Sequence, residues 1–234
     1  MTDKPQLVLL PGLLCNARLF AHQCRHLADA ADCHVADLTG GDSIATMAAG
    51  VLDGAPESFS LAGLSMGGYV ALEIMRQAPE RVERLALLDT SARPDTAEQQ
   101  QRRRSLLKLA ETGRFKGVTP QLLPLLVHED RLSDSPLVDE IMAMAEAVGR
   151  DAFARQQTAI MNRRDSRDTL EGISCPTLVV CGRQDAITPL EISEESASLL
   201  PRGRLVVIED CGHLSSMERP QATTALMRDW LLNR

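Results

Sequence analysis

The chain has 234 residues, of which 44% are apolar and 3% are aromatic, and its formal net charge is −7. This length is enough for one domain with a large core that also carries an inserted subdomain. The negative charge would repel a phosphate backbone, and the few aromatic side chains offer little surface for base stacking, so nucleic acid is not expected as a partner.

Membrane and export signals are missing from the sequence. No apolar run approaches the length of a membrane span, and no basic start leads into an apolar export segment. The six cysteines contain no Cys-x-x-Cys pair, which favours reduced thiols in the core over disulfides or a zinc site. We therefore expect a cytoplasmic protein with no membrane span.

The first part of the chain alternates short apolar runs with amphipathic stretches. Runs that are apolar on both faces are typical of buried strands in a parallel sheet, and apolar residues at helical spacing lie between them. The predicted strands are 6–10, 33–38, 59–64 and 84–88, and the predicted helices are 17–30, 43–52 and 66–77.

The stretch 92–168 breaks this alternation. It holds no convincing strand, and its Leu, Ile and Met residues recur at helical spacing. We expect four helices, separated by Gly113, Pro120, Pro136 and Gly149. A helical insert after one strand of a parallel sheet would form a lid, so we predict a core of residues 1–91 and 169–234 and a helical cap of residues 92–168.

Three consecutive arginines, Arg102, Arg103 and Arg104, lie on the first predicted helix of the cap. Most runs of this kind are solvated faces, and the alternative is contact with an anionic substrate or a carrier protein.

The last part of the chain returns to the alternation of strands and helices. The predicted strands are 177–181 and 205–208, and the predicted helices are 190–200 and 220–232. The whole order indicates an α/β fold, a doubly wound and mostly parallel sheet with helices on both faces.

The most informative stretch joins the predicted strand 59–64 to the helix that follows it. Ser65 lies at the junction, in the pattern Gly63-Leu64-Ser65-Met66-Gly67. A sharp strand-to-helix turn brings the two elements so close together that a side chain on either glycine would clash. Because such a turn lifts the hydroxyl clear of the sheet, the pattern predicts that Ser65 is a nucleophile. The alternative is a glycine-rich turn with an incidental serine.

A serine hydroxyl needs a base to take its proton, and the base needs a carboxylate that fixes its tautomer. Among the five histidines, His213 follows the last predicted strand, at the edge where parallel sheets place their sites. Asp185 follows the preceding strand at the same edge and completes the chain order Ser, Asp, His. Asp89, at the end of an earlier strand, is the alternative acid, while Asp210 lies too close to His213 in the sequence.

Backbone amides near the serine would stabilise the oxyanion that forms when an ester is attacked. Met66, the residue after the nucleophile, is expected to supply one amide. Leu13, in the loop after the first strand, is expected to supply the other, because Gly12 permits close approach. We expect neither a metal nor an organic cofactor.

These motifs together resemble the α/β-hydrolase superfamily. The resemblance covers nearly the whole chain and rests on the turn around Ser65, on Leu10-Pro11-Gly12-Leu13, on Gly182-Arg183-Gln184-Asp185 and on Gly212-His213. Within the superfamily, the chain is similar to small bacterial carboxylesterase-like members, such as pimeloyl-carrier methyl esterases and enol-lactone hydrolases. The resemblance implies the α/β-hydrolase fold, a catalytic triad of Ser65, Asp185 and His213, and an oxyanion hole made by Leu13 and Met66.

Two features depart from the usual pattern of that superfamily. Its loop commonly reads His-Gly where this chain has Pro11-Gly12, which bears on the shape of the loop and on the second amide. The chain also begins almost at its first core strand, so we expect no N-terminal hairpin and a sheet of about six strands.

The sequence therefore predicts a cofactor-free serine hydrolase, a carboxylesterase-like enzyme acting on a small-molecule ester or thioester with a small to medium acyl chain. The Leu- and Met-rich cap would form an apolar pocket wall. The same triad also serves lactone opening, perhydrolysis, C–C cleavage or a lyase step, and the motifs do not separate these reactions. An alternative of another class is a ligand receptor or signalling protein that keeps a hydrolase-like pocket without turnover.

Overall fold

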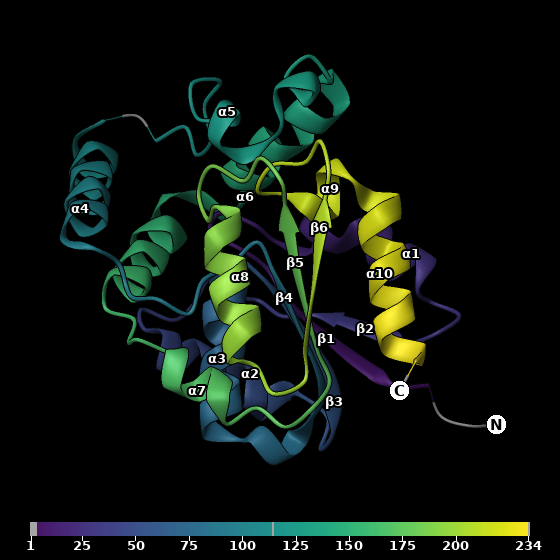
Figure 1. Ribbon diagram of the computed structural model, residues 1–234. Coiled ribbons are helices and arrows are strands. Elements are labelled where there is room, and N and C mark those ends of the chain that lie inside the picture. Colours follow the sequence, from purple (N-terminus) through teal and green to yellow (C-terminus); the bar gives the residue numbers. More distant parts are fainter. Residues whose placement is uncertain (1–3, 114, 234) are drawn as a thin grey trace.

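A computed structural model describes residues 4–113 and 115–233 of the chain. At its centre lies a sheet of six strands, all parallel, in the order β2-β1-β3-β4-β5-β6 (Figure 1). This arrangement confirms the predicted α/β fold and the predicted size of the sheet. The strands are β1 (Gln6–Leu10), β2 (Asp32–Val35), β3 (Phe59–Leu64), β4 (Val82–Leu88), β5 (Thr177–Gly182) and β6 (Gly203–Ile208).

Burial explains why these short apolar runs form strands. Every residue of β3 and β5, which lie inside the sheet, is buried. At one edge of the sheet, β2 instead alternates between exposed and half-buried residues. Strands that are buried on both faces need apolar residues at successive positions, which is the pattern that the sequence shows.

Helices cover both faces of the sheet (Figure 1). One face carries α1 and α10, whose apolar residues cluster with Leu7 and Leu9 of β1. The other carries α2, α3 and α8, where the apolar cluster includes Val8 and Leu10. Successive residues of β1 thus point to opposite faces, as in any strand. These helices are α1 (Ala21–His26), α2 (Ile44–Gly54), α3 (Met66–Gln77), α8 (Leu190–Leu199) and α10 (Pro220–Leu232), and the short elements near them are η1 (Ala17–Phe20), η2 (Pro79–Arg81), α7 (Arg167–Glu171) and α9 (Ser215–Glu218).

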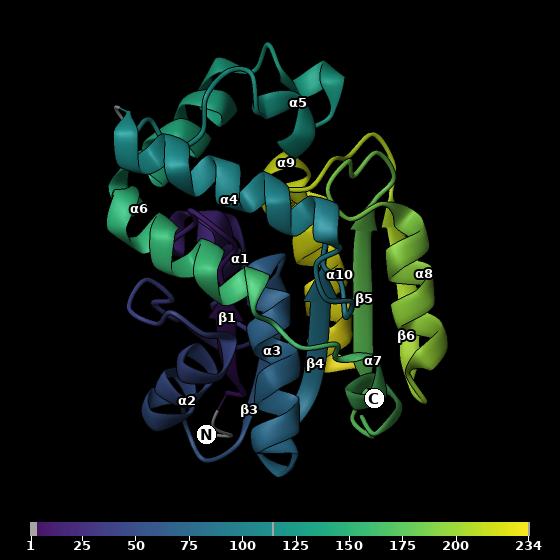
Figure 2. The same ribbon diagram turned by 90° about the vertical axis from the view of Figure 1, so that its left-hand side faces the viewer.

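Most of residues 92–168, called the helical segment below, lies over the carboxyl ends of the strands, and its last residues run down to α7 near the opposite end of the sheet (Figure 1 and Figure 2). Its described residues form no strand, and Gly149, with a φ of +82°, divides its longest helix into two. Met144 and Phe153 join the same apolar cluster as Leu14 after β1, so the segment packs onto the core. Its elements are α4 (Ala97–Thr112), α5 (Leu123–Leu126), η3 (Glu129–Arg131) and α6 (Ser135–Met161), followed by the start of α7.

None of the helices in the described ranges combines the length and the apolar character that crossing a bilayer requires.

Two elements near the start of the chain are shorter than the sequence predicted. The predicted helix 17–30 begins as a 3-10 turn, η1, capped by the Asn16 side chain, and its α-helical part ends at His26. The predicted strand 33–38 ends at Val35, because β2 is the outermost strand of the sheet and pairs with the short strand β1 alone among the described strands. The spacing of apolar residues does not define these end points.

Candidate active site

Ser65 lies at the sharp turn between β3 and α3. Its φ is +54° and its ψ is −116°, a conformation that residues with a side chain rarely adopt. A Cβ atom at Gly63 would lie 2.3 Å from the carbonyl oxygen of Gly67, and one at Gly67 would lie 1.9 Å from the carbonyl oxygen of Leu10. Both distances are shorter than a van der Waals contact, so the two positions require glycine.

The structure brings Ser65, His213 and Asp185 together in one chain of hydrogen bonds. Ser65 Oγ lies 2.8 Å from Nε2 of His213, whose Nδ1 lies 2.8 Å from Oδ2 and 3.0 Å from Oδ1 of Asp185. With the proton on Nδ1, the ring donates to the carboxylate and accepts from the serine hydroxyl. His213 and Asp185 are 3% and 4% exposed, so bulk water does not compete for these bonds, whereas Asp210 is exposed.

Several donors favour the ionised form of Asp185. The amides of Ile187 and Thr188 donate to Oδ1 at 2.8 and 2.9 Å, and the Thr188 hydroxyl donates to Oδ2 at 2.7 Å. Burial alone would raise the pKa of Asp185, but His213 and Thr188 outweigh it, and the pKa is lowered. Burial alone would lower the pKa of His213, but the charge of Asp185 and its hydrogen bond raise that pKa above the ordinary value.

Asp89, the alternative acid, accepts hydrogen bonds from Gly182 and Ser215 instead of from the ring. Its Oδ1 accepts from the Gly182 amide at 3.0 Å, and its Oδ2 accepts from the amide and the hydroxyl of Ser215. Gly182 precedes the loop of Asp185 and Ser215 follows His213, so Asp89 joins the two loops. Burial and the charge of Asp185 raise the pKa of Asp89 to about 7.

The two backbone amides expected to face the serine lie at the start of α3 and in the loop after β1. Met66 is the first residue of α3, and the first amides of a helix have no partner within it. A Cβ atom at Gly12 would lie 3.4 Å from Cβ of Ser65, so the loop that carries Leu13 is in contact with the serine. Within the described part of the chain, the amides of Leu13 and Met66 have no hydrogen-bond acceptor.

Gln156, in α6, is a polar residue that the sequence reasoning missed. It is fully buried, and its Oε1 accepts from the Leu14 amide at 3.0 Å while its Nε2 donates to the Leu38 carbonyl at 3.2 Å. It thereby fixes the loop after β1 from the side of the helical segment. The only signal in the sequence is a glutamine on the apolar face of a predicted helix.

The helical segment also holds the loop that carries His213. The Leu126 carbonyl accepts from the His213 amide at 3.0 Å. Glu218, which is fully buried, accepts hydrogen bonds from the amides of Gly212 and His128. The position of the imidazole therefore depends on residues of both regions.

A cavity of about 340 Å³ opens beside Ser65, between the helical segment and the carboxyl ends of the strands, which are called the sheet edge below. Most of its wall is apolar and comes from the helical segment. The apolar side chains include Leu106, Leu122, Leu125, Met144, Phe153 and Ile160.

Arg102 and Arg103 add positive charge to the lining of this cavity. For Arg103 the expectation of a solvated face is wrong, because only 19% of its side chain is exposed and its guanidinium binds Asp95 at 2.6 Å and Gln157 at 2.8 Å. Arg102 and Arg104 are exposed. The packing of α4 against α6 therefore gives the three arginines different environments, and the order of residues in the sequence does not reveal this difference.

Asp89, Cys181 and Asp185 place one potential metal-ligand atom each within 4.8 Å of one another. Hydrogen bonds already engage both carboxylates. Burial, with the charge of Asp89, raises the pKa of the Cys181 thiol to about 12, and a protonated thiol is a poor metal ligand. This set of donors does not favour a metal ion.

Known proteins resemble the chain along nearly its whole length. The model of the alpha/beta hydrolase fold family matches residues 55–220. A pimeloyl-[acyl-carrier protein] methyl ester esterase of Vibrio parahaemolyticus is 26% identical, and the alignment covers 97% of this chain and 94% of the relative.

Two solved structures extend this similarity to three dimensions. A malate-bound esterase from Thermogutta terrifontis is 31% identical and superposes with a TM-score of 0.88, covering 98% of this chain and 90% of the esterase. An enol-lactonase from Burkholderia xenovorans is 26% identical, with a TM-score of 0.89 and coverage of 98% and 92%. The similarity therefore includes the helical segment as well as the sheet.

Proposed function

Because the chain belongs to the alpha/beta hydrolase fold family, we propose that it is a cofactor-free serine hydrolase that cleaves a carboxylic ester or thioester through an acyl-enzyme. The observation that carries this proposal is the chain of hydrogen bonds from Ser65 through His213 to Asp185, at the wall of an apolar cavity. The similarity to two esterases supports it.

In the first step, Nε2 of His213 takes the proton of the Ser65 hydroxyl while Oγ attacks the carbonyl carbon. Asp185 holds the ring through Nδ1 and stabilises the imidazolium that forms. His213 then gives the proton to the leaving alcohol or thiol, and the acyl group remains on Ser65 as an ester. In the second step, His213 takes a proton from water, the water oxygen attacks the acyl carbon, and Ser65 regains its proton as the acid leaves.

The oxyanion of each tetrahedral intermediate would accept hydrogen bonds from the amides of Leu13 and Met66. A single donor of this kind contributes about 3 kcal/mol to the stability of the transition state. Both amides belong to backbone that neighbouring elements hold in place, so little reorganisation is needed as the charge develops.

The substrate class follows from the cavity. Its volume of about 340 Å³ and its apolar wall suit an acyl part of small to medium size. We assign the chemistry to a core of residues 1–91 and 169–234, and the wall of the pocket to a cap of residues 92–168. The cytoplasmic location stays a prediction from the sequence.

Lactone opening is a second candidate, favoured by the similarity to an enol-lactonase. A lactone is a cyclic ester, so the attack by Ser65 would be the same, and the leaving alcohol would stay attached to the acyl chain. Parallel assays with linear esters and lactones distinguish the two.

Replacement of the nucleophile tests the proposal. The wild type is expected to hydrolyse a short p-nitrophenyl ester and to be labelled by a fluorophosphonate on Ser65. Ser65→Ala is expected to lose the label and at least about 10³-fold in kcat/KM. Ser133→Ala, at an exposed position of the helical segment, is the matched control and should keep both.

Circular dichroism establishes that both variants fold. Full turnover by folded Ser65→Ala would contradict the proposal. A wild-type protein that binds a metabolite tightly but turns over no activated ester, thioester or lactone would indicate a receptor.

A further inference from the structure

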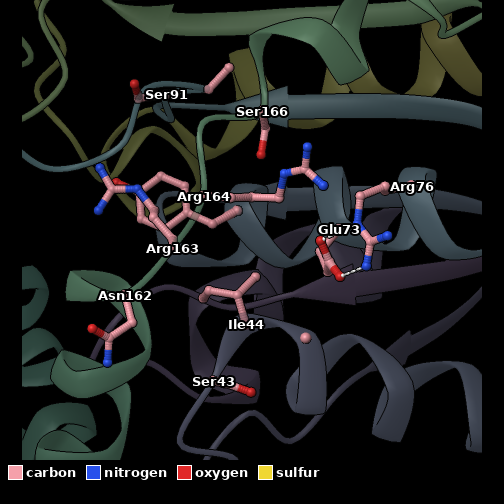
Figure 3. A pocket seen from close by; sticks show the side chains of 12 residues that line it. Ser43, Ile44, Glu73, Arg76, Ser91, Asn162, Arg163, Arg164 and Ser166 are labelled. Carbon is pink, nitrogen blue, oxygen red and sulfur yellow. Dashed lines mark hydrogen bonds and ion pairs between the residues drawn. The ribbon is translucent and has the colours of Figure 1, made fainter.

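A second cavity, of about 240 Å³, lies next to the one that holds Ser65. Tyr69 lines both cavities and so forms part of the wall between them. Figure 3 shows the second cavity, called the arginine pocket below, with Arg76, Arg163 and Arg164 in its lining. The proposed hydrolysis assigns no step to any of these arginines.

One face of α3 leads from Ser65 to the arginine pocket. Tyr69, Glu73 and Arg76 follow the serine at spacings of four, four and three residues, which places them on the same side of the helix. At a rise of about 1.5 Å per residue, Arg76 lies roughly 16 Å along the helix from Ser65. The arginine pocket is therefore a neighbour of the Ser65 cavity and not a part of it.

Two of the arginines are held by buried acids. Arg76 donates to Glu73 through both Nε, at 2.9 Å, and Nη2. Arg163 has 7% of its side chain exposed, donates to Asp95 at 2.6 Å, and lies over the Tyr69 ring, with its guanidinium carbon 4.3 Å from the ring centre. These contacts fix both guanidinium groups at the wall of the pocket.

Arg164 has the most capacity left to bind a ligand. It donates through Nε to the Asp165 carbonyl at 3.2 Å, and its terminal nitrogens have no partner among the residues that the structure describes. Figure 3 shows its guanidinium group on the same side of the pocket as that of Arg76, near the Glu73 carboxylate, while that of Arg163 points the other way. An anion in this place would therefore meet Arg164 first.

Uncharged donors lie on the opposite wall. Ile44 and Ala45, the first two residues of the eleven-residue helix α2, line the pocket. Figure 3 shows Ile44 below Arg164. Amides at the start of a helix have no acceptor within it and favour negative charge nearby. Ser166, which is buried, adds a hydroxyl to the wall on the side of Arg164.

The charge of the pocket is opposite in sign to that of the chain. Three arginines and one glutamate line the pocket, and Asp95 binds Arg163 from outside the lining, which leaves a net charge of +1, whereas the whole chain carries −7. Arg76 beside Glu73 lowers the pKa of that carboxyl, so the glutamate is charged at neutral pH and the count holds. A concave site of positive sign concentrates anions even on a negative protein.

We propose that the arginine pocket binds a small anion through a phosphate or carboxylate group. The terminal nitrogens of Arg164 donate to its oxygens, because the planar guanidinium fork matches both groups. Arg76, already paired with Glu73, contributes its remaining donors. The volume of the pocket is several times the roughly 30 Å³ that one water occupies in the liquid, so the group can carry a short carbon chain.

Isothermal titration calorimetry of the whole protein tests the proposal, with inorganic phosphate in one arm and succinate in the other. Ionic strength is held constant with chloride. Saturable binding is expected in at least one arm, and the two arms distinguish a phosphate ligand from a carboxylate ligand. Tyr69 is the only tyrosine of the chain, so the ring signals of a tyrosine-labelled sample are expected to shift during the titration that binds.

Two substitutions with opposite expected effects locate the site. Arg164→Gln removes a positive charge and is expected to weaken binding about tenfold. Glu73→Gln frees the donors of Arg76 and is expected to tighten binding about threefold. Arg25→Gln removes the same charge from an exposed position on α1 and should leave the affinity within about twofold of the wild type.

No saturable binding by the wild type in either arm would overturn the proposal. Equal affinities of Arg164→Gln and Arg25→Gln would also overturn it, because the anion would then bind elsewhere or only through the overall charge. Neither residue lines the Ser65 cavity, so ester turnover should be the same in both variants. The proposal of an anion site and the proposal of an esterase can therefore be refuted independently of each other.

Discussion

The sheet edge and the helical segment contribute to the candidate active site in different ways. At the sheet edge, Ser65, Asp185 and His213 follow β3, β5 and β6, whose carboxyl ends meet because all strands run in parallel. The helical segment instead contributes single groups, such as the Gln156 side chain and the Leu126 carbonyl, that reach the core only through packing.

Under the proposed function, this difference separates the chemistry from the choice of substrate. Backbone geometry at the sheet edge would set which atoms react, whereas the side chains of the helical segment shape the cavity. Substitutions at the sheet edge should therefore reduce turnover, and those in the helical segment should change stability and substrate preference.

The largest effect is expected from the acid that contacts the imidazole. Asp185→Asn should lower kcat roughly 10³- to 10⁴-fold, because an amide neither stabilises the imidazolium nor holds the required tautomer. Asp89→Asn changes a carboxylate that accepts hydrogen bonds from Gly182 and Ser215 and should lower kcat about tenfold. Steady-state kinetics with one p-nitrophenyl ester compares the two, and equal losses would remove the distinction between them.

Turnover should also depend on pH through the base at the sheet edge. In the proposed mechanism His213 takes a proton only when it is neutral, so kcat/KM should fall about tenfold per pH unit below its pKa and level off above it. Burial opposes the proton, but the charge and hydrogen bond of Asp185, with Asp89 and Glu218, raise this pKa above the ordinary value. The midpoint for Asp185→Asn should therefore lie at lower pH than that of the wild type. An unchanged midpoint in a pH–rate profile would mean that Asp185 is not the source of the shift.

A smaller effect is expected at the contact between the two regions. Gln156→Ala leaves the buried Leu14 amide without its acceptor, which should lower the free energy of unfolding by about 1–3 kcal/mol. The loop that carries Leu13 should also loosen, and kcat should fall about tenfold with little change in KM. Urea unfolding and steady-state kinetics measure the two effects. Gln101→Ala, at an exposed position of α4, is the control and should change neither quantity. If Gln156→Ala behaved like this control, the loop after β1 would not depend on Gln156 for its stability.

The smallest effect is expected in the cavity wall. Leu125 is half-buried and lines the cavity, so Leu125→Ala should lower kcat/KM about threefold for an octanoate ester and leave an acetate ester almost unchanged. Leu109→Ala, at a residue that is 67% exposed, is the matched control. Equal losses for both esters would indicate damage to the sheet edge instead of a change in the wall.

The sequence was most informative where a local pattern has one structural solution. The glycines around Ser65 predict its turn because any side chain there would collide with Leu10 or with the turn itself. The order of strands predicts that Asp185 and His213 lie at one edge, and the structure places Asp185 against the imidazole. Chain order alone left Asp89 as an alternative, since it also ends a strand at that edge.

By itself, the sequence determined the parallel sheet, the glycine-flanked turn and the edge at which the polar residues gather, because apolar periodicity and the steric limits of glycine act over a few residues. Only the tertiary structure decided that Gln156 binds the loop after β1, that Arg103 is withdrawn from solvent, and that Arg76 and Arg164 meet in one pocket. These outcomes depend on how helices that are far apart in the chain pack together, and no local sequence pattern encodes such long-range contacts.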